Sequence, residues 1–123
     1  MRSKILVADD NTASRELIRE VLEMSGYEVV EASDGADAVS RARENAPDLL
    51  LVDIQMPNLD GYGVLRELRA DPGTSGLPVV ALTAFAMQGD RERALDAGFD
   101  GYISKPVEIA ALRREIKRFL GAL

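Results

Sequence analysis

Cysteine and histidine are both absent from this chain. Without cysteine the protein has no disulfides and no thiolate-ligated metal, a composition typical of the cytoplasm, where we expect the protein to be located. Without histidine it has no Ser/His or Cys/His catalytic pair, no imidazole-ligated zinc and no internal phosphohistidine. Any metal chemistry must therefore use oxygen ligands.

Long hydrophobic runs and an excess of positive charge are also missing. The first apolar run covers only Ile5–Ala8 before two aspartates interrupt it, so we expect no signal peptide and no membrane insertion. The 21 acidic residues outnumber the 15 basic ones and give a formal charge of −6. Direct binding to nucleic acid or to an anionic membrane is therefore disfavoured.

The 123 residues are enough for one domain with a proper core, and 46% of them are hydrophobic. No linker, repeat or low-complexity segment appears, and Gly73–Gly76 is a short loop-like patch. We therefore expect a single domain over residues 1–123. Its initial methionine and complete final helix favour a stand-alone protein.

Five short apolar runs alternate with longer stretches of helical periodicity, the pattern of repeated βα units. Several runs are apolar at consecutive positions, as expected of parallel strands that are covered on both faces. The predicted strands are Ile5–Ala8, Tyr27–Val30, Leu49–Val52, Val79–Leu82 and Gly101–Ile103. Right-handed crossovers between them predict an α/β fold, a doubly wound five-stranded parallel sheet with five helices.

The first predicted helix runs from an N-cap at Asn11 or Thr12 to a stop at Gly26, and the second from Asp34 to Pro47. A weakly amphipathic helix is expected over about residues 87–97, with Gly89 inside it. The apolar stripes of the other four helices are Leu17, Ile18, Val21 and Leu22; Ala38, Val39 and Ala42; Gly61, Val64, Leu65 and Leu68; and Ile109, Leu112, Ile116, Phe119 and Leu123.

Ligands of doubly wound sheets bind outside the carboxyl ends of the strands. The residues that follow the predicted strands there are Asp9, Asp10, Asp53, Thr83 and Lys105. Three converging carboxylates repel one another, and a hard divalent cation such as Mg²⁺ would offset that repulsion. Any one of these residues has an ordinary structural explanation, such as a helix cap or a solvated lysine, but together they predict a functional site.

A carboxylate can attack phosphorus and form an aspartyl phosphate. In that reaction the metal and Lys105 would neutralise charge on the transferred oxygens, and the Thr83 hydroxyl would bond a phosphoryl oxygen only in the modified state. A contact made only in one state is what a switch requires.

The sequence resembles the receiver domain of bacterial response regulators over essentially its whole length. The motifs that carry the resemblance are Asp9-Asp10, the run from Asp53 to Pro57 with Asp60-Gly61, Thr83-Ala84, Tyr102, and Lys105-Pro106. The resemblance implies a flavodoxin-like (βα)5 fold with strand order 2-1-3-4-5.

The resemblance also implies a role for each motif residue. Asp53 is the phosphoacceptor, Asp10 and Asp53 ligate Mg²⁺ directly, with Mn²⁺ as a substitute, and Asp9 acts directly or through water. The backbone carbonyl of Gln55 completes the ligands. Thr83 and Tyr102 are the coupled switch residues, and the Lys105-Pro106 peptide is cis.

The implied phosphodonor is a histidine kinase or a histidine phosphotransfer protein, recognised around residues 12–23. The signal leaves through the face of the fourth helix, fifth strand and fifth helix to a protein target, or the phosphoryl group passes to another histidine protein. The stretch Ala84–Met87 is the favoured output surface, and the basic cluster Arg113, Arg114, Lys117 and Arg118 is interpreted as a solvated helix face. A monomer or a weak dimer is expected. Phe85 is hypothesised to slow loss of the phosphoryl group by restricting attacking water.

Two alternatives are open at this stage. A phosphatase of the haloacid-dehalogenase type also forms an aspartyl phosphate with Mg²⁺, but it usually carries a second aspartate where this chain has Gln55. A flavodoxin-like binding module shares the fold class, but it needs a phosphate-cradling loop where this chain has Asp9 and Asp10. A receiver, in contrast to the phosphatase, is expected to act as a switch and not as an enzyme with a separate substrate.

Overall fold

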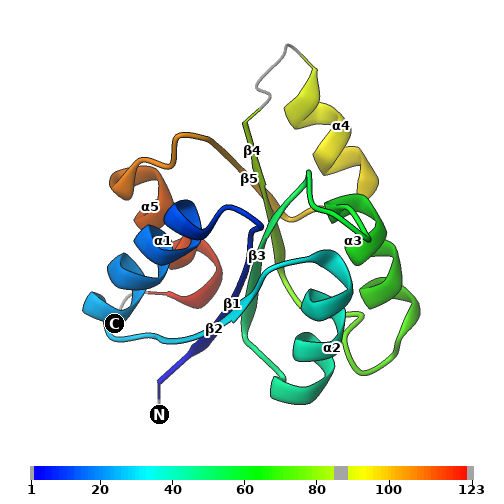
Figure 1. The fold of residues 1–123 in the computed structure, drawn as a ribbon, viewed down its shortest axis with the longest axis horizontal. Helices are drawn as coiled ribbons and strands as arrows, with labels where there is room; N and C mark the ends of the chain where they lie inside the picture. Colours follow the sequence, from blue (N-terminus) through cyan, green and yellow to red (C-terminus); the bar gives the residue numbers. More distant parts are fainter. Residues whose placement is uncertain (1, 85–88, 122–123) are drawn as a thin grey trace.

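Five parallel strands form one sheet in the order β2-β1-β3-β4-β5 in the computed structural model, which describes residues 2–84 and 89–121 (Figure 1). The strands are β1 (Lys4–Ala8), β2 (Glu28–Ala32), β3 (Leu49–Asp53), β4 (Val79–Thr83) and β5 (Gly101–Ser104). The helices are α1 (Thr12–Met24), α2 (Gly35–Asn45), α3 (Gly61–Ala70), α4 (Asp90–Ala97) and α5 (Ile109–Leu120). The predicted fold class and strand order are confirmed.

The helices cover both faces of the sheet (Figure 1). One face packs against α1 and α5 through Ile18, Val21, Leu22, Leu112 and Ile116. The other face packs against α2, α3 and α4. Strands β3 and β4 are buried at every position, which explains why their sequences are apolar at consecutive positions and not at alternate ones.

Side-chain caps fix where three of the helices begin, and so fix the loops at the carboxyl edge of the sheet. The side chain of Asn11 accepts a hydrogen bond from the Ser14 amide, that of Asp34 from the Asp37 amide, and that of Asp60 from the Gly63 amide. Of the two residues predicted as N-cap of the first helix, Asn11 is the N-cap in the structure.

Helix α1 ends in a Schellman motif, and this corrects the predicted start of the second strand. The Gly26 amide donates to the Glu23 carbonyl and the Tyr27 amide donates to the Leu22 carbonyl, with Gly26 at φ 94°. Tyr27 therefore belongs to the helix end, and β2 runs over Glu28–Ala32 instead of Tyr27–Val30. Gly26 ends the helix as predicted.

The apolar stripes of α1 and α5 are narrower than the sequence predicted, whereas those of α2 and α3 are buried in full. Leu17 and Ile109 were expected to face the core, but they are 47% and 46% exposed. Helix α1 buries Ile18, Val21 and Leu22, and helix α5 buries Leu112 and Ile116, so an apolar residue beside either line of contact stays in water. Leu123 lies outside the described residues.

Helix α4 begins at Asp90, later than the expected start near residue 87. Gly89 is its N-cap, with φ 92°, and does not lie inside the helix. A positive φ is unfavourable for residues with a side chain, so this glycine sets the point where the helix can start. No helix among the described residues is long and apolar enough to cross a bilayer.

Candidate functional site

The alternation of side chains along the strands brings Asp9, Asp53 and Lys105 to one face of the sheet. Along β1, Ile5 and Val7 face α1 and α5, and Asp9 continues the same alternation one residue beyond the strand. Asp53 follows Leu49 and Leu51 in the same way, and Lys105 follows Ile103. The three side chains therefore meet at the carboxyl edge of the sheet, beside the N-terminus of α1.

Lys105 lies between the two aspartates and binds both. Its Nζ donates to Asp9 Oδ2 at 2.7 Å and to Asp53 Oδ2 at 2.8 Å. The side chains are 15%, 0% and 8% exposed for Lys105, Asp9 and Asp53 respectively. This is a desolvated ion triad with one more negative charge than positive charge.

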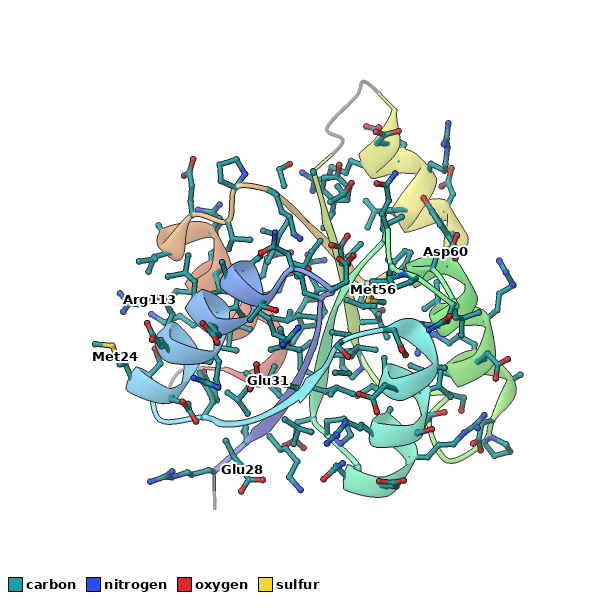
Figure 2. All side chains as sticks on the ribbon, viewed as in Figure 1. Met24, Glu28, Glu31, Met56, Asp60 and Arg113 are labelled. Atoms are coloured by element: carbon teal, nitrogen blue, oxygen red, sulfur yellow. The ribbon has the colours of Figure 1, made fainter. Side chains whose placement is uncertain are left out.

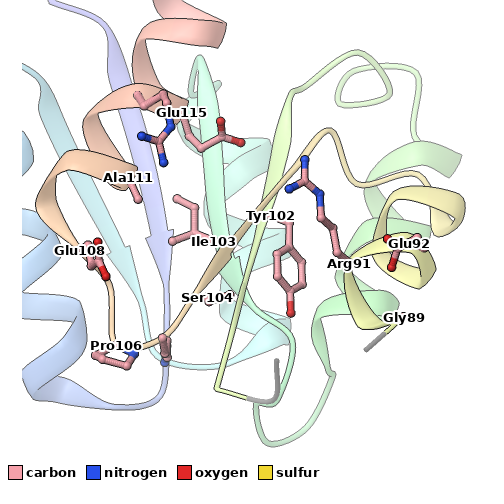
Figure 3. Close-up of a pocket in the computed structure, with 12 residues that line it drawn as sticks. Gly89, Arg91, Glu92, Tyr102, Ile103, Ser104, Pro106, Glu108, Ala111 and Glu115 are labelled. Carbon is pink, nitrogen blue, oxygen red and sulfur yellow. The ribbon is translucent and has the colours of Figure 1, made fainter. Parts of the chain in front are cut away.

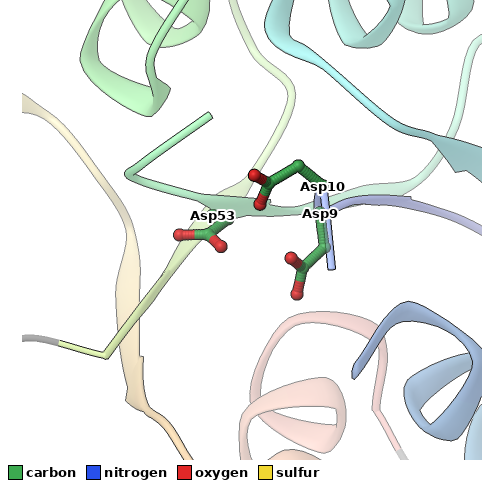
Figure 4. A group of neighbouring side chains, drawn as sticks. All are labelled: Asp9, Asp10 and Asp53. Atoms are coloured by element: carbon green, nitrogen blue, oxygen red, sulfur yellow. The ribbon is translucent and has the colours of Figure 1, made fainter. Parts of the chain in front are cut away.

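Asp10 adds a third carboxylate at the solvent side of the triad (Figure 4). Oxygen atoms of Asp9, Asp10 and Asp53 all lie within 4.8 Å of one another. With Lys105 counted, the site keeps a net charge of two negative units among closely spaced oxygens. Such a set favours a divalent cation over water alone.

Backbone amides bond the carboxylate oxygens of Asp9 and Asp53 that do not bond Lys105. The Asn11 amide donates to Asp9 Oδ1 at 2.9 Å, and the Gln55 amide donates to Asp53 Oδ1 at 3.0 Å. Each carboxylate is thus fixed at one oxygen by its own loop and at the other by Lys105. The contacts orient both groups before any ligand binds.

The balance of burial and hydrogen bonding shifts the pKa of Asp53 and of Lys105 upward. Burial raises the pKa of Asp53, and the hydrogen bonds from Lys105 and the Gln55 amide only partly offset that rise. Burial alone would lower the pKa of Lys105, but the hydrogen bonds to Asp53 and Asp9 outweigh it and raise that pKa. The lysine is therefore held as a cation.

Gly61 explains why the Asp60-Gly61 motif accompanies the site. A Cβ at this position would lie 2.8 Å from Ile54 Cα and 2.9 Å from the Asp53 carbonyl oxygen. The Gly61 amide also donates to the Ile54 carbonyl at 2.8 Å, so the start of α3 rests directly on the chain that follows Asp53. Only glycine permits this approach, which supports the backbone that immediately precedes Gln55.

Thr83 and Tyr102 lie on the opposite face of the sheet from the lysine. Thr83 continues the alternation of Val79 and Ala81 toward α4, and Tyr102 packs against the same core layer. Ala81 pairs with Tyr102 and Thr83 with Ser104, so the two predicted switch residues lie on adjacent strands two positions apart. Burial, followed by the nearby Asp90 carboxylate, raises the pKa of Tyr102.

The amide of Lys105 donates to the Thr83 carbonyl at 2.7 Å, which ties the lysine to the end of β4. The Lys105-Pro106 peptide is cis. Tyr102 stands in a pocket of about 970 Å³ between β5, α4 and α5, whose lining includes Arg91, Glu92 and Lys105 (Figure 3). The pocket therefore reaches from the predicted output face to the lysine.

The remaining candidates fall into two groups. Gln55 is exposed and, with Asp10, borders a second cleft beside the site. Phe85 and most of the Ala84–Met87 stretch lie outside the described residues, and Ala84 is exposed.

Sequence reasoning missed Arg15 and Glu31, which lie next to the site. Arg15 donates through Nη1 to the Asp9 carbonyl at 2.7 Å and through Nε to Glu31 at 3.0 Å. An arginine on a helix and a glutamate on the neighbouring strand carry no periodic signal that would single them out.

The comparisons with known proteins agree with this geometry. The model of the response regulator receiver domain matches residues 5–117. The polar-differentiation response regulator DivK of Brucella anthropi is 40% identical over 121 residues, which cover 98% of each chain. The family is that of a signalling switch.

Two solved structures show the same fold over the same length. The receiver domain of the sensor histidine kinase PA1611 from Pseudomonas aeruginosa, solved with a magnesium ion coordinated in the active site cleft, is 39% identical with a TM-score of 0.90, covering 99% of this chain and 100% of that one. The chemotaxis protein CheY4 of Vibrio cholerae is 26% identical with a TM-score of 0.90, covering 98% and 100%. This chain therefore belongs to the response regulator receiver domain family.

Proposed function

We propose that Asp53 is the phosphoacceptor of a single receiver domain over residues 1–123, and that its donor is a phosphohistidine on a histidine kinase or a phosphotransfer protein. The observation that carries the proposal is the partly buried lysine that bridges Asp53 and Asp9 at 2.8 and 2.7 Å. A bridge of this kind leaves a carboxylate at the edge of the sheet beside a fixed cation, which is what transfer of a phosphoryl group needs.

In the transfer, an oxygen of the Asp53 carboxylate attacks phosphorus and the bond from phosphorus to the donor imidazole nitrogen breaks. The other ring nitrogen of the phosphohistidine carries a proton, so the imidazole keeps the electron pair of the broken bond and leaves as the neutral base. Lys105 stays protonated and moves its hydrogen bonds toward the phosphoryl oxygens, because its raised pKa holds the charge through the reaction.

The donor set fits a divalent cation. Asp9, Asp10 and Asp53 supply carboxylate oxygens within 4.8 Å of one another, and the Gln55 carbonyl is the proposed fourth protein ligand. Mg²⁺ is the proposed ion and Mn²⁺ a substitute, since both prefer oxygen ligands. When bound, such an ion would neutralise charge on the phosphoryl oxygens.

The switch is proposed to run from Thr83 to Tyr102. A new hydrogen bond from the Thr83 hydroxyl to a phosphoryl oxygen would draw the end of β4 toward Asp53 and change the space beside Tyr102. Moving a population from 1:99 to 99:1 takes about 5.5 kcal/mol. Charge-assisted hydrogen bonds from Lys105 and Thr83 together with the cation can supply that order of magnitude.

The proposed output surface is the face of α4, β5 and α5, where the pocket around Tyr102 opens. A protein target would bind there, or the phosphoryl group would pass to another histidine protein. The haloacid-dehalogenase alternative gains no support, because Gln55 stands where those enzymes usually carry an acid/base aspartate.

The experiment is phosphorylation of the purified protein by a phosphohistidine donor with Mg²⁺, followed by intact and peptide mass spectrometry. We expect one added phosphoryl group on the peptide that carries Asp53, and none in Asp53→Asn. Asp60→Asn is the matched control, because that aspartate follows the same strand but caps α3. Equal labelling of Asp53→Asn and wild type would overturn the proposal.

A further inference from the structure

The carbonyl of Asp9 is held by a side chain from outside the family motifs. Arg15, on the first turns of α1, donates through Nη1 to that carbonyl at 2.7 Å. The same guanidinium donates through Nε to Glu31 on β2 at 3.0 Å, and its side chain is only 16% exposed. Glu31 lies on the edge strand beside α1 (Figure 2).

With this contact, each polar atom of Asp9 has a hydrogen-bond partner. Its amide donates to the Ala32 carbonyl at 3.1 Å, and its carboxylate accepts from the Asn11 amide and from Lys105. The carbonyl belongs to the peptide that joins Asp9 to Asp10. Arg15 therefore fixes the plane of that peptide, and with it the direction of the bond from the peptide nitrogen to the Cα atom of Asp10.

Glu31 fixes the guanidinium and balances its charge. An uncompensated arginine beside three carboxylates would repel a divalent cation, whereas Arg15 and Arg19 together with Glu31 and Glu23 form a set with no net charge. The pKa of Glu31 is consistent with a strong pair: burial tends to raise it, but the hydrogen bonds from Arg19 and Arg15 lower it overall. The arginine can then orient the peptide without opposing the cation.

We propose that Arg15, held by Glu31, is a positioning residue that sets the Asp9-Asp10 carboxylates for the divalent cation. The inference rests on the proposed function, since it assigns Asp9 and Asp10 to the cation. Arg15 acts through the peptide and does not touch the phosphoryl group.

Arg19 supplies a matched control within the same helix. Its Nη1 donates to the other oxygen of Glu31 at 2.9 Å, and it also pairs with Glu23 at 3.6 Å. It therefore shares the strand partner of Arg15, but it makes no contact with Asp9 among the described residues. If the ion pairs between α1 and β2 had only a structural role, Arg15→Ala and Arg19→Ala would affect the Asp9-Asp10 site equally.

The test compares Arg15→Ala, Arg15→Lys and Arg19→Ala by two backbone amide measurements. The first is hydrogen exchange of the Asn11 amide in metal-free protein, because that amide reports whether the Asp9 carboxylate is held. The second is the Mg²⁺ dissociation constant from amide shifts. Thermal unfolding of each variant gives the folded fraction, and Arg15→Lys serves if Arg15→Ala does not fold.

For Arg15→Ala we expect faster exchange at Asn11 and Mg²⁺ binding weaker by about tenfold. For Arg19→Ala we expect wild-type exchange and an affinity within about twofold of wild type. Arg15→Lys should recover only part of the loss, because an ammonium lacks the fork that bonds the carbonyl and Glu31 together.

Equal behaviour of Arg15→Ala and Arg19→Ala in both measurements would overturn the inference, as would full recovery in Arg15→Lys. If wild type itself does not bind Mg²⁺, the proposed function fails. In that case exchange at Asn11 still decides whether Arg15 positions Asp9.

Discussion

Replacing Lys105 by methionine should destabilise the metal-free protein strongly at neutral pH. The change keeps most of the side-chain volume but removes the cation that bonds Asp9 and Asp53. With side chains 0% and 8% exposed, the two carboxylates cannot be solvated in its place. Removing one partner of a buried pair costs about 3–5 kcal/mol, against a typical total stability of about 5–15 kcal/mol. We expect a loss of about 3 kcal/mol at pH 7.

The loss should depend on pH in a defined direction. Burial already raises the pKa of Asp53, and the variant also lacks the lysine hydrogen bond that partly offsets this rise. The folded variant therefore takes up a proton at a higher pH than the unfolded chain, so stability returns as pH falls. Mg²⁺ should also restore part of the loss by supplying positive charge.

Urea unfolding followed by circular dichroism, in chelator, measures this effect, since the chain has no tryptophan for fluorescence. Lys117→Met is the control, because Lys117 is exposed on α5 and forms no ion pair within the described part of the chain. It should change stability by less than about 0.5 kcal/mol. A loss below about 1 kcal/mol in Lys105→Met, or a loss that grows as pH falls, would refute the reasoning.

Three further predictions concern stability. Asp53→Asn should stabilise the metal-free protein at pH 7, and urea unfolding should show the gain shrink as pH falls through the raised pKa of Asp53 toward its ordinary value of 3.8; no gain at pH 7 would contradict this. Glu31→Gln should make stability less sensitive to acid. The pKa of Glu31 is lowered in the folded protein, so this carboxylate stabilises wild type above its ordinary pKa of 4.5, and that stability is lost as pH falls through the lowered pKa. Acid unfolding curves of the same shape for wild type and Glu31→Gln would contradict this. Gly35→Ala should cost about 1–3 kcal/mol, because its Cβ would meet the Leu59 carbonyl group, with the carbonyl carbon at 2.6 Å; an unchanged thermal midpoint would contradict the steric argument.

The central strands were predictable because a strand buried on both faces is apolar at consecutive positions. β3 and β4 are apolar at consecutive positions and lie in the middle of the sheet. The edge strand β2 is half exposed and lacks that consecutive apolar pattern. Its start was therefore predicted one residue early, at Tyr27, whose amide bonds the last turn of α1. Edges and helix ends depend on contacts that periodicity does not encode.

The site was predictable to the extent that it uses strand ends. Asp9, Asp10, Asp53 and Lys105 each follow an apolar run, and parallel strands bring those ends together. The ion triad itself, with one lysine shared by two buried carboxylates, needed coordinates. The contact from Arg15 to a backbone carbonyl was not predictable, since any residue type would present the same carbonyl.

The spacing of apolar residues also did not predict which apolar side chains are exposed. Leu17 belongs to an apolar stripe by spacing but lies beside the line of contact, and Met24 is 84% exposed. Met24 and Arg113 both project away from the body of the protein (Figure 2). Which apolar residue of a helix meets the sheet is set by the rotation of that helix against its neighbours.

Beryllofluoride binding tests the central claim most directly, because this ion mimics an acyl phosphate on a carboxylate. Backbone amide spectra would be recorded with Mg²⁺ for wild type and for Asp53→Asn. The account predicts Mg²⁺-dependent binding in wild type alone, with shifts that extend from Asp53 through Thr83 to Tyr102. Binding that survives in Asp53→Asn, or no binding in wild type, would contradict the assignment of Asp53 as the phosphoacceptor.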